Sequence, residues 1–449
     1  APSAPTDRHP GEARGGTASR THRALSRPGP SGAGRHGDCL RGGRRGDRSA
    51  PPSAPPAKPA LTRNLSLFPH RTLFWLTVFL CVMSLVFLFS VNIGEVLKPN
   101  ATQTSLFHLF RLAIMQALWV GVGFVAMALM AAIPPRFWQQ SAWVWMALCV
   151  GVLALIQFTP LGHAFNGAER WIRVPVPVLG AITIQPSEAF KLASLFWFCA
   201  LYALPERRRW TRGAYLLLAV WLFGVILVER QPDLGTAMLI FALGVGVAFL
   251  GGASLAKLGL LLATSVLGIA ALIITPLIKS HLSGEPLDAH KTSYRVQRIM
   301  AMLDPWSDEQ GFGYQMVHAQ LAVGSGGLTG VGLGMGREKR YLPAAESDYI
   351  FATIAEEAGF LGGIIAISLL GGVVYACFHL AMRARTRFGR LFAGGLALWI
   401  ALSAGINLGM ALGLLPTVGI PLPFLSAGGS ALVSLMAALG VAQSIAREA

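Results

Sequence analysis

The stretch "AAESDYIFATIAEEAGFLGGIIAISLLGGVVYAC" (residues 344–377) decides the fold class of this chain. Residues 349–377 form an apolar run longer than the roughly 20 residues that an α-helix needs to cross a bilayer. Within twelve residues the stretch also carries four carboxylates: Glu346, Asp348, Glu356 and Glu357. Charges at membrane depth are costly and are seldom kept without a partner or a task. The stretch therefore predicts a membrane-spanning helix with functional carboxylates near its first turns.

The composition of the whole chain agrees with a membrane protein. Of its 449 residues, 53% are hydrophobic and only 13% are charged, whereas a soluble protein carries about 25% charged residues. At roughly 20 apolar residues per span, the sequence predicts ten transmembrane helices: 72–92, 110–132, 141–160, 187–204, 213–229, 233–251, 257–279, 349–377, 390–413 and 424–445. The predicted fold class is thus an all-α polytopic membrane protein, with its transmembrane domain over residues 71–449.

The charges of the predicted loops orient these helices. The segments "PERRRWTRG" (205–213) and "MRARTRFGR" (382–390) carry four Arg each and follow the fourth and eighth helices. With ten spans, both segments fall on the same side as both termini, and loops rich in Lys and Arg stay in the cytoplasm. We therefore expect cytoplasmic termini and a large extracytoplasmic loop, residues 280–348, between the seventh and eighth helices.

The first 70 residues form a basic tail rich in Gly, Pro and Ser. The tail holds twelve of the 37 Lys and Arg residues and four of the 21 Asp and Glu residues. Because it has no hydrophobic periodicity, it is expected to be disordered. Basic residues are not interleaved with aromatic ones, which disfavours a nucleic-acid partner. Since the chain begins with Ala and its first Met is Met83, one interpretation is that residues 1 to about 60 are a translated upstream stretch.

The large loop contains seven Gly within residues 324–336. One interpretation is a flexible connection. The other is a backbone that must approach something closely, because Gly lets amide N–H groups reach a ligand without a side-chain clash.

Five motifs follow one another along the outer side of the predicted helices. They are "GAERWI" (167–172) with "QPSEAFK" (185–191), "QPDLGT" (231–236), "DPWSDEQGFGYQ" (304–315), "YLPAAESDYIFA" (341–352) and "LPTVGIPLPFLSAGGS" (415–430). In these motifs and their order, from about residue 72 to the C-terminus, the chain resembles the SEDS proteins (shape, elongation, division and sporulation), the FtsW/RodA polymerases of the bacterial cell wall.

The resemblance implies a peptidoglycan glycosyltransferase of the bacterial cytoplasmic membrane. Such an enzyme polymerises lipid II into glycan strands at the outer face, among membrane lipids, and works with a class B penicillin-binding protein. The chain departs from the family pattern at Ala344, at Glu346–Ser347 and at Ala427, which stands in the common "SYGG". The motifs "DPW" and "YLP" favour the division type, whereas "VGIPLP" favours the elongation type, so the division type is slightly preferred.

The resemblance places the essential carboxylate of the family on Asp348. Glycosyl transfer from a polyprenyl diphosphate needs a base for the proton of the attacking hydroxyl and cations for the departing diphosphate. Asp348 stands where a base would be needed, just before the eighth predicted helix. A helix N-terminus lowers the pKa of a nearby carboxylate, so burial or a neighbouring acid would have to offset this effect.

The predicted substrate-binding residues lie in the other outer motifs: Arg170, Glu188, Lys191, Asp233 and Glu356. Arg170 and Lys191 are the best cations for the diphosphate. The alternatives are structural: an ion pair between Glu188 and Lys191, an N-cap at Asp233, and pairing of Glu356 within the protein. A divalent cation, Mg²⁺ or Mn²⁺, could bridge diphosphate and carboxylate, although no ligand spacing in the sequence establishes a metal site.

Two other functions fit parts of the same pattern. A lipid II flippase would also have acids and broken helices at membrane depth, but the polar motifs cluster at one face instead of lining a path across the membrane. A non-catalytic scaffold for a penicillin-binding protein would keep normal glycan synthesis after Asp348→Ala.

Overall fold

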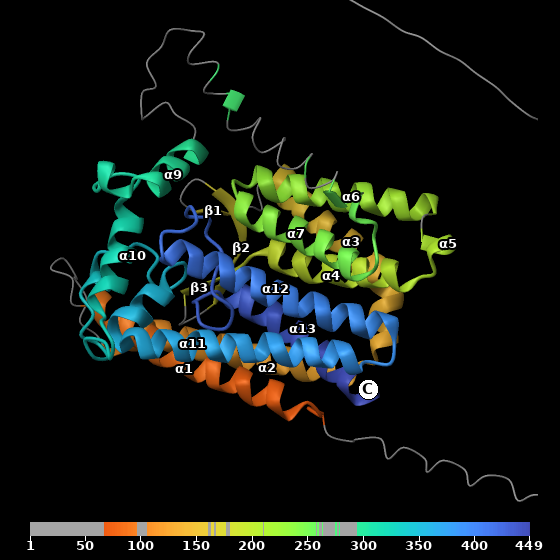
Figure 1. Cartoon of the computed structure of the whole chain (residues 1–449), viewed down its shortest axis with the longest axis horizontal. Helices are drawn as coiled ribbons and strands as arrows, with labels where there is room; N and C mark the ends of the chain where they lie inside the picture. The colour runs from red at the N-terminus through yellow and green to blue at the C-terminus, as the bar shows by residue number, and fades with distance from the viewer. Residues whose placement is uncertain are drawn as a thin grey trace, which may run out of the picture. The chain divides into compact units, whose positions relative to one another are not determined.

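The computed structural model describes residues 67–96, 106–159, 163–165, 168–176, 180–209, 211–256 and 294–449, with a few isolated positions between 258 and 278. The chain divides into residues 1–61 and 62–449, and all described residues belong to the second unit. This unit is mostly helical (Figure 1). The predicted tail lies outside the described residues except for its last four positions.

One small sheet interrupts the series of helices in this unit. The elements are α1 (Arg71–Val96), α2 (Leu106–Ala132), α3 (Pro135–Phe158), β1 (His163–Phe165), β2 (Ala168–Val176), β3 (Gly180–Ile184), α4 (Pro186–Ala203), α5 (Glu206–Arg209), α6 (Arg212–Arg230), α7 (Leu234–Leu250), α9 (Tyr294–Leu303), η1 (Pro305–Asp308), α10 (Tyr314–Ser325), η2 (Glu338–Arg340), α11 (Ile350–Arg383), α12 (Arg387–Ala411) and α13 (Gly429–Glu448).

Seven helices of the described part are long and apolar enough to cross a membrane: α1, α2, α3, α6, α11, α12 and α13. Helix α7 is apolar but has only 17 residues. Helix α4 has 18 residues, and its Glu188 and Lys191 lower its hydropathy. The predicted span 257–279 falls almost entirely outside the described residues. A multi-pass membrane fold is confirmed, whereas the count of ten spans stays a prediction.

A three-stranded antiparallel sheet shows that the all-α prediction was incomplete. The strand order is β1-β2-β3, and Ile172 of β2 lies opposite Ile184 of β3. The predicted helices left residues 161–186 as a connection between the third and fourth spans. Pro175 lies inside β2, where it cannot donate to the ladder. The sheet matters for the site, because β2 carries Arg170 and β3 leads into α4.

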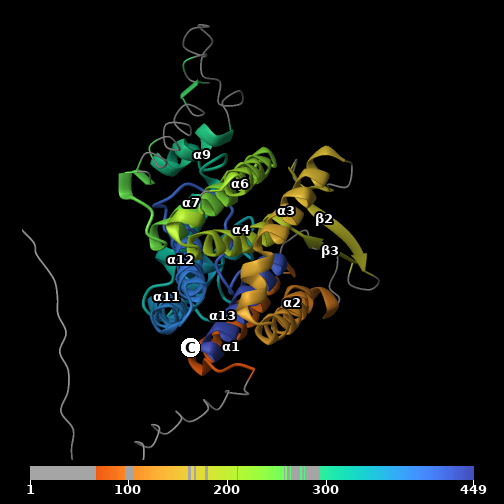
Figure 2. The same ribbon diagram turned by 90° about the vertical axis from the view of Figure 1, so that its right-hand side faces the viewer.

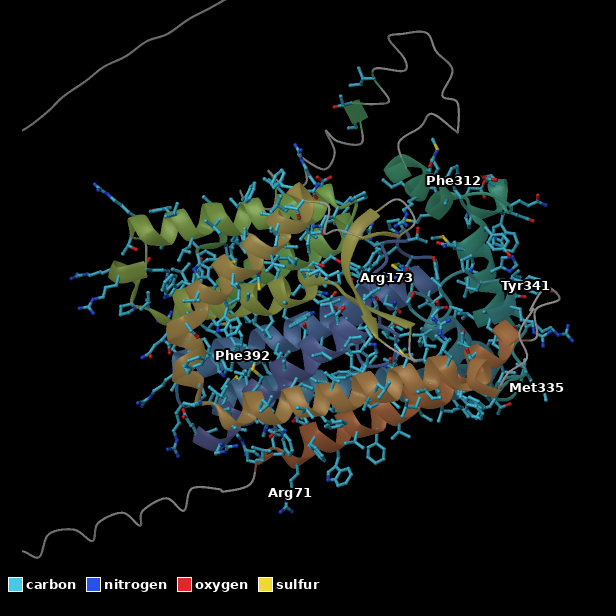
Figure 3. All side chains as sticks on the ribbon, turned by 180° about the vertical axis from the view of Figure 1, so that it is seen from behind. Arg71, Arg173, Phe312, Met335, Tyr341 and Phe392 are labelled. Carbon is cyan, nitrogen blue, oxygen red and sulfur yellow. The ribbon has the colours of Figure 1, made fainter. Side chains whose placement is uncertain are left out.

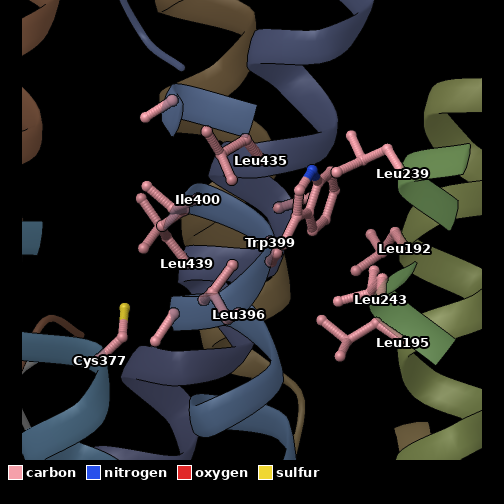
Figure 4. Packing of buried hydrophobic residues seen from close by; sticks show 14 of the residues in the cluster. Leu192, Leu195, Leu239, Leu243, Cys377, Leu396, Trp399, Ile400, Leu435 and Leu439 are labelled. Atoms are coloured by element: carbon pink, nitrogen blue, oxygen red, sulfur yellow. The ribbon is translucent and has the colours of Figure 1, made fainter. Parts of the chain in front are cut away.

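The helices pack in neighbouring pairs around a continuous apolar core. Helix α13 packs on α2, α12 on α11, and α3 on both α4 and α6; Figure 2 views several of these helices end-on. In Figure 4, Trp399 of α12 extends toward Leu192 of α4 and Leu239 of α7. All three side chains are buried, so this layer joins the middle of the chain to its C-terminal third.

Helix α11 is interrupted at Gly359, whose backbone has φ 64° and ψ −164°. The glycine-rich segment 324–336 packs against the helix at this break. Val331 N–H donates to the Glu356 carbonyl at 3.0 Å, and a Cβ on Gly330 would lie 2.1 Å from the Glu357 carbonyl oxygen. The segment does approach a neighbour closely, whereas contact with a ligand stays a prediction. The neighbour it approaches is the backbone of α11.

Candidate active site

Asp348 lies in a tight turn directly before α11. The carbonyl of Ala344 accepts backbone N–H bonds from Ser347, Asp348 and Tyr349 at 3.0–3.3 Å, and the helix begins at Ile350. The sequence placed Asp348 at the N-terminal end of this helix, and the structure confirms that position. Figure 3 shows Phe312, Met335 and Tyr341 at one end of the helical bundle, so the segment leading to Asp348 gathers at that end.

The environment of Asp348 raises the pKa of its carboxyl to about 6. Burial makes the largest contribution, because it disfavours the charged form. The positive charge of Arg298 lowers the pKa, while the acids Glu346 and Asp233 raise it. Burial therefore provides the offset to the helix dipole that the sequence analysis required. A carboxyl with this pKa is ionised at neutral pH and can still accept a proton readily.

Arg298 is the cation that sequence reasoning missed. It lies in α9, inside the segment predicted to be the large extracytoplasmic loop. One of its guanidinium nitrogens donates to the carbonyl of Thr417, in the last of the five motifs. Its charge also acts on Asp348. The signal in the sequence was a lone cationic segment, "YRVQRIM", with no feature that tied it to a carboxylate 50 residues later.

Arg170 and Asp233 meet at the turn between α6 and α7. An Arg170 guanidinium nitrogen lies 3.8 Å from an Asp233 carboxylate oxygen, and Arg170 Nε donates to the Gln231 carbonyl at 2.6 Å. The other carboxylate oxygen of Asp233 accepts the Thr236 N–H at 3.2 Å and caps α7. The N-cap interpretation of Asp233 is thus confirmed, and the same residue also influences the charge of Asp348.

Glu188 and Lys191 form an ion pair within the first turns of α4. Their charged atoms are 2.7 Å apart, and both side chains are buried. The Lys191 ammonium also lies 5.7 Å from the centre of the Trp399 ring. The structural interpretation of this pair is confirmed.

The pair lines a small pocket beneath the last motif, with Trp399, Ser403, Ile420 and Ser426 among the lining residues. Ser426 also bonds to the backbone beside Asp348. The pocket that holds Lys191 therefore shares a wall with the segment that holds Asp348.

Glu356 and Glu357 both bind other groups of the protein itself. One carboxylate oxygen of Glu356 accepts the N–H groups of Arg337 and Glu338 at 2.6 and 3.1 Å. Glu357 pairs with Lys339 in a fully buried contact. Within the described part of the chain no hydrogen bond or ion pair joins Glu356 to Asp348, so the geometry favours the structural interpretation of Glu356. The Lys339 side chain is buried.

The described residues bring one set of predicted groups together. Asp348, Asp233 and Arg170 gather with Arg298 at the end of the bundle where α7 and α11 begin. Glu188 and Lys191 form the neighbouring pocket. Across the ranges described here, no group of three His, Cys, Asp or Glu side chains is placed to hold a metal ion. A role for Mg²⁺ or Mn²⁺ stays a prediction.

The arrangement suits proton transfer beside an anionic leaving group. Asp348 offers a basic carboxylate, and the guanidinium groups of Arg170 and Arg298 lie on the segments around it. Guanidinium groups bind phosphate oxygens in a bidentate manner. Chemically, the site can take a proton from a hydroxyl while cations stabilise a departing phosphate.

Comparisons of the sequence with known proteins all point to one protein family. Residues 71–449 match the model of the FtsW/RodA/SpoVE family, described as cell cycle proteins. A probable peptidoglycan glycosyltransferase FtsW from Thioalkalivibrio sp. is 35% identical, over 80% of this chain and 84% of the relative. The peptidoglycan glycosyltransferase MrdB from Escherichia coli is 36% identical, over 73% of this chain and 83% of the relative.

Two solved structures share the fold over most of the chain. One belongs to a peptidoglycan synthase complex that coordinates polymerization and crosslinking; it is 27% identical, with a TM-score of 0.61, and the match covers 83% of this chain and 97% of the other. The second is the rod shape determining protein RodA from Thermus thermophilus, at 26% identity and a TM-score of 0.55, covering 83% and 96%.

Proposed function

Because the chain belongs to the FtsW/RodA/SpoVE family of cell cycle proteins and is a peptidoglycan glycosyltransferase, we propose that Asp348 is the general base of its reaction. The substrate is lipid II, together with the nascent glycan strand. The observation that carries this proposal is the placement of a half-buried carboxylate of raised pKa, on which the charge of Arg298 acts, at the start of a membrane-spanning helix.

The reaction proceeds by displacement at the anomeric carbon of the donor. Asp348 takes the proton of the attacking sugar hydroxyl, and the hydroxyl oxygen forms the new glycosidic bond. The bond from the anomeric carbon to the diphosphate breaks, and the polyprenyl diphosphate leaves with the electron pair. Arg170 and Arg298 stabilise the charge on the diphosphate as it departs. Glu188 and Lys191 line the adjoining pocket, where the substrate would meet their ion pair.

The active site faces the extracytoplasmic side of the cytoplasmic membrane. Helix α11 separates Asp348 at its start from Arg383 at its end. The 24 residues from 360 to 383, beyond the break at Gly359, correspond to about 36 Å of helix, more than a bilayer core. Because Arg383 opens the basic segment 382–390, which the charge rule assigns to the cytoplasm, Asp348 belongs to the opposite side.

A class B penicillin-binding protein is the proposed partner. Support comes from the structural similarity to a component of a peptidoglycan synthase complex in which polymerization and crosslinking are coordinated. A partner that crosslinks strands would receive the glycan directly from this enzyme.

Reconstitution with labelled lipid II tests the proposal. The purified protein, with and without a class B penicillin-binding protein, is placed in liposomes, and glycan strands are separated by length. Wild type should form strands, and Asp348→Asn should lose them by about 10²–10⁴-fold. Strands from Asp348→Asn at the wild-type rate would rule out the base. Transbilayer movement of label without polymer would favour the flippase.

A further inference from the structure

Asn407 joins the backbone of Asp348 to a second segment of the chain. It lies near the end of α12 and is completely buried. Its Nδ2 donates to the Asp348 carbonyl at 2.8 Å and to the Ile420 carbonyl at 2.8 Å. A single side chain thus connects the turn before α11 to the loop after α12.

The chemistry of the two acceptors fixes the orientation of the Asn407 amide. Both partners are carbonyl oxygens, which only accept, and the NH₂ group supplies two N–H donors. Each donor therefore serves one carbonyl, and the reverse orientation would place Oδ1 against both. The Oδ1 atom itself has no hydrogen-bond partner among the described residues. Both hydrogen bonds of this side chain are therefore made to the two backbone segments.

The hydrogen bond from Asn407 is one of three ties, by which we mean hydrogen bonds to the carbonyls of three consecutive residues, 346–348. The Glu346 carbonyl accepts the Ala427 N–H at 2.8 Å, and the Ser347 carbonyl accepts the Ser426 hydroxyl at 2.5 Å. With the bond from Asn407 to the Asp348 carbonyl, each residue of the turn 346–348 is held by the segment that runs from α12 to α13. A backbone held at three successive carbonyls has little freedom to rotate.

These ties set where the Asp348 carboxylate points. Gly419, which lies next to Ile420, has φ +72°, and a Cβ on it would lie 3.6 Å from Asp348 Oδ2. The carboxylate therefore lies beside the same loop that Asn407 binds. Losing one tie would let the turn and the loop move relative to each other.

We propose that Asn407 is a positioning residue for the glycosyl transfer, acting through the Asp348 backbone without contacting substrate. This inference rests on the proposed function of Asp348. A base must lie within hydrogen-bond reach of the hydroxyl it deprotonates, and a displacement of about 1 Å can reduce the rate by about 10²-fold. Asn407 holds the base at its working position.

The test compares Asn407→Ala with a matched control, Ser444→Ala. Ser444 also makes a buried side-chain bond to a carbonyl, that of Ile133, at 2.7 Å, but lies fifteen residues beyond the start of α13 at Gly429. For each variant, kcat, KM for lipid II, the pH dependence of kcat and the melting temperature are measured on the full chain in liposomes.

We expect Asn407→Ala to reduce kcat by about 10–100-fold, to leave KM within about twofold, and to move the midpoint of the pH profile. Ser444→Ala should lower the melting temperature but keep kcat and the pH midpoint of wild type. Asn407→Asp keeps the shape and loses both donors, so it should lose at least as much kcat as Asn407→Ala. If Asn407→Ala keeps the kcat and pH midpoint of wild type, the inference is wrong.

A second variant keeps the test decisive if Asn407→Ala fails to fold. Ser426→Ala removes the neighbouring tie to Ser347 and should reduce kcat in the same manner; wild-type kcat in this variant would then overturn the inference. Asp348→Asn in the same assay separates the two proposals. Activity in Asp348→Asn would refute the base itself, whereas its loss together with full activity in Asn407→Ala would refute only the positioning role.

Discussion

The Nζ atom of Lys339 lies 2.5 Å from Oε1 of Glu357, and both side chains are fully buried. The Ser90 hydroxyl of α1 lies 2.6 Å from both oxygens of Glu357 and 2.9 Å from Lys339 Nζ. Removing one charge leaves the other buried without compensation, so Lys339→Met should lower the unfolding free energy by about 3–5 kcal/mol. The measurement is thermal unfolding in detergent.

The double variant Lys339→Met/Glu357→Leu is the control for this pair. Replacing both charges by apolar side chains should recover most of the lost stability, because no unpaired charge remains. Equal melting temperatures for the single and double variants would contradict a buried ion pair that acts as one unit.

The rate of glycan synthesis should depend on pH through Asp348. The base works in its deprotonated form, and the pKa of its carboxyl is about 6. The initial rate should therefore rise with pH, reach half its maximum near pH 6 and level off above pH 7. Initial rates between pH 4.5 and 8 measure this profile. A rate that is constant between pH 5 and 7 would contradict the proposed base.

Arg298→Gln should move that profile to higher pH. The positive charge of Arg298 lowers the pKa of Asp348, so its removal should raise the midpoint of the rate profile. Arg298→Lys keeps the charge and serves as the control, with a midpoint closer to that of wild type. An unchanged midpoint in Arg298→Gln would place Arg298 away from the base.

The break in α11 should be intolerant of a side chain. A Cβ on Gly359 would lie 2.3 Å from the Gly330 nitrogen, and the backbone there has φ +64°. Gly359→Ala should therefore lower stability by at least about 1–2 kcal/mol from the left-handed conformation alone. Gly371, in the same helix, has no atom within 4 Å of a built Cβ. Gly371→Ala should be neutral or stabilising by up to about 1 kcal/mol, as melting temperatures can show.

Local patterns in the sequence predicted the local features correctly. The apolar run 349–377 became α11, the spacing of Glu188 and Lys191 gave their ion pair, and Asp233 caps α7. Each of these depends on residues that are neighbours in the chain, where helix geometry fixes which side chains meet. The missed sheet shows the limit of such patterns, because Pro175 is typical of a loop.

Contacts between distant segments could not be predicted in the same way. Asn407 is 59 positions from Asp348 in the sequence. A buried Asn needs hydrogen-bond partners, but the sequence does not say which carbonyls accept from it. The tertiary arrangement of α12 and the turn before α11 supplies that information.

The stability of the folded protein should depend on pH through Asp348. Its carboxyl has a pKa of about 6 in the folded protein, above that of an exposed aspartate, so between these two values the folded state holds a proton that the unfolded state releases. Stability should therefore fall as pH rises from about 4 to 6, by about 1–3 kcal/mol. Asp348→Asn carries no such charge and should melt at a higher temperature than wild type at pH 7.5, with the difference shrinking at pH 4. If the two proteins respond identically to pH, the Asp348 carboxyl is not held in an environment that disfavours its charge.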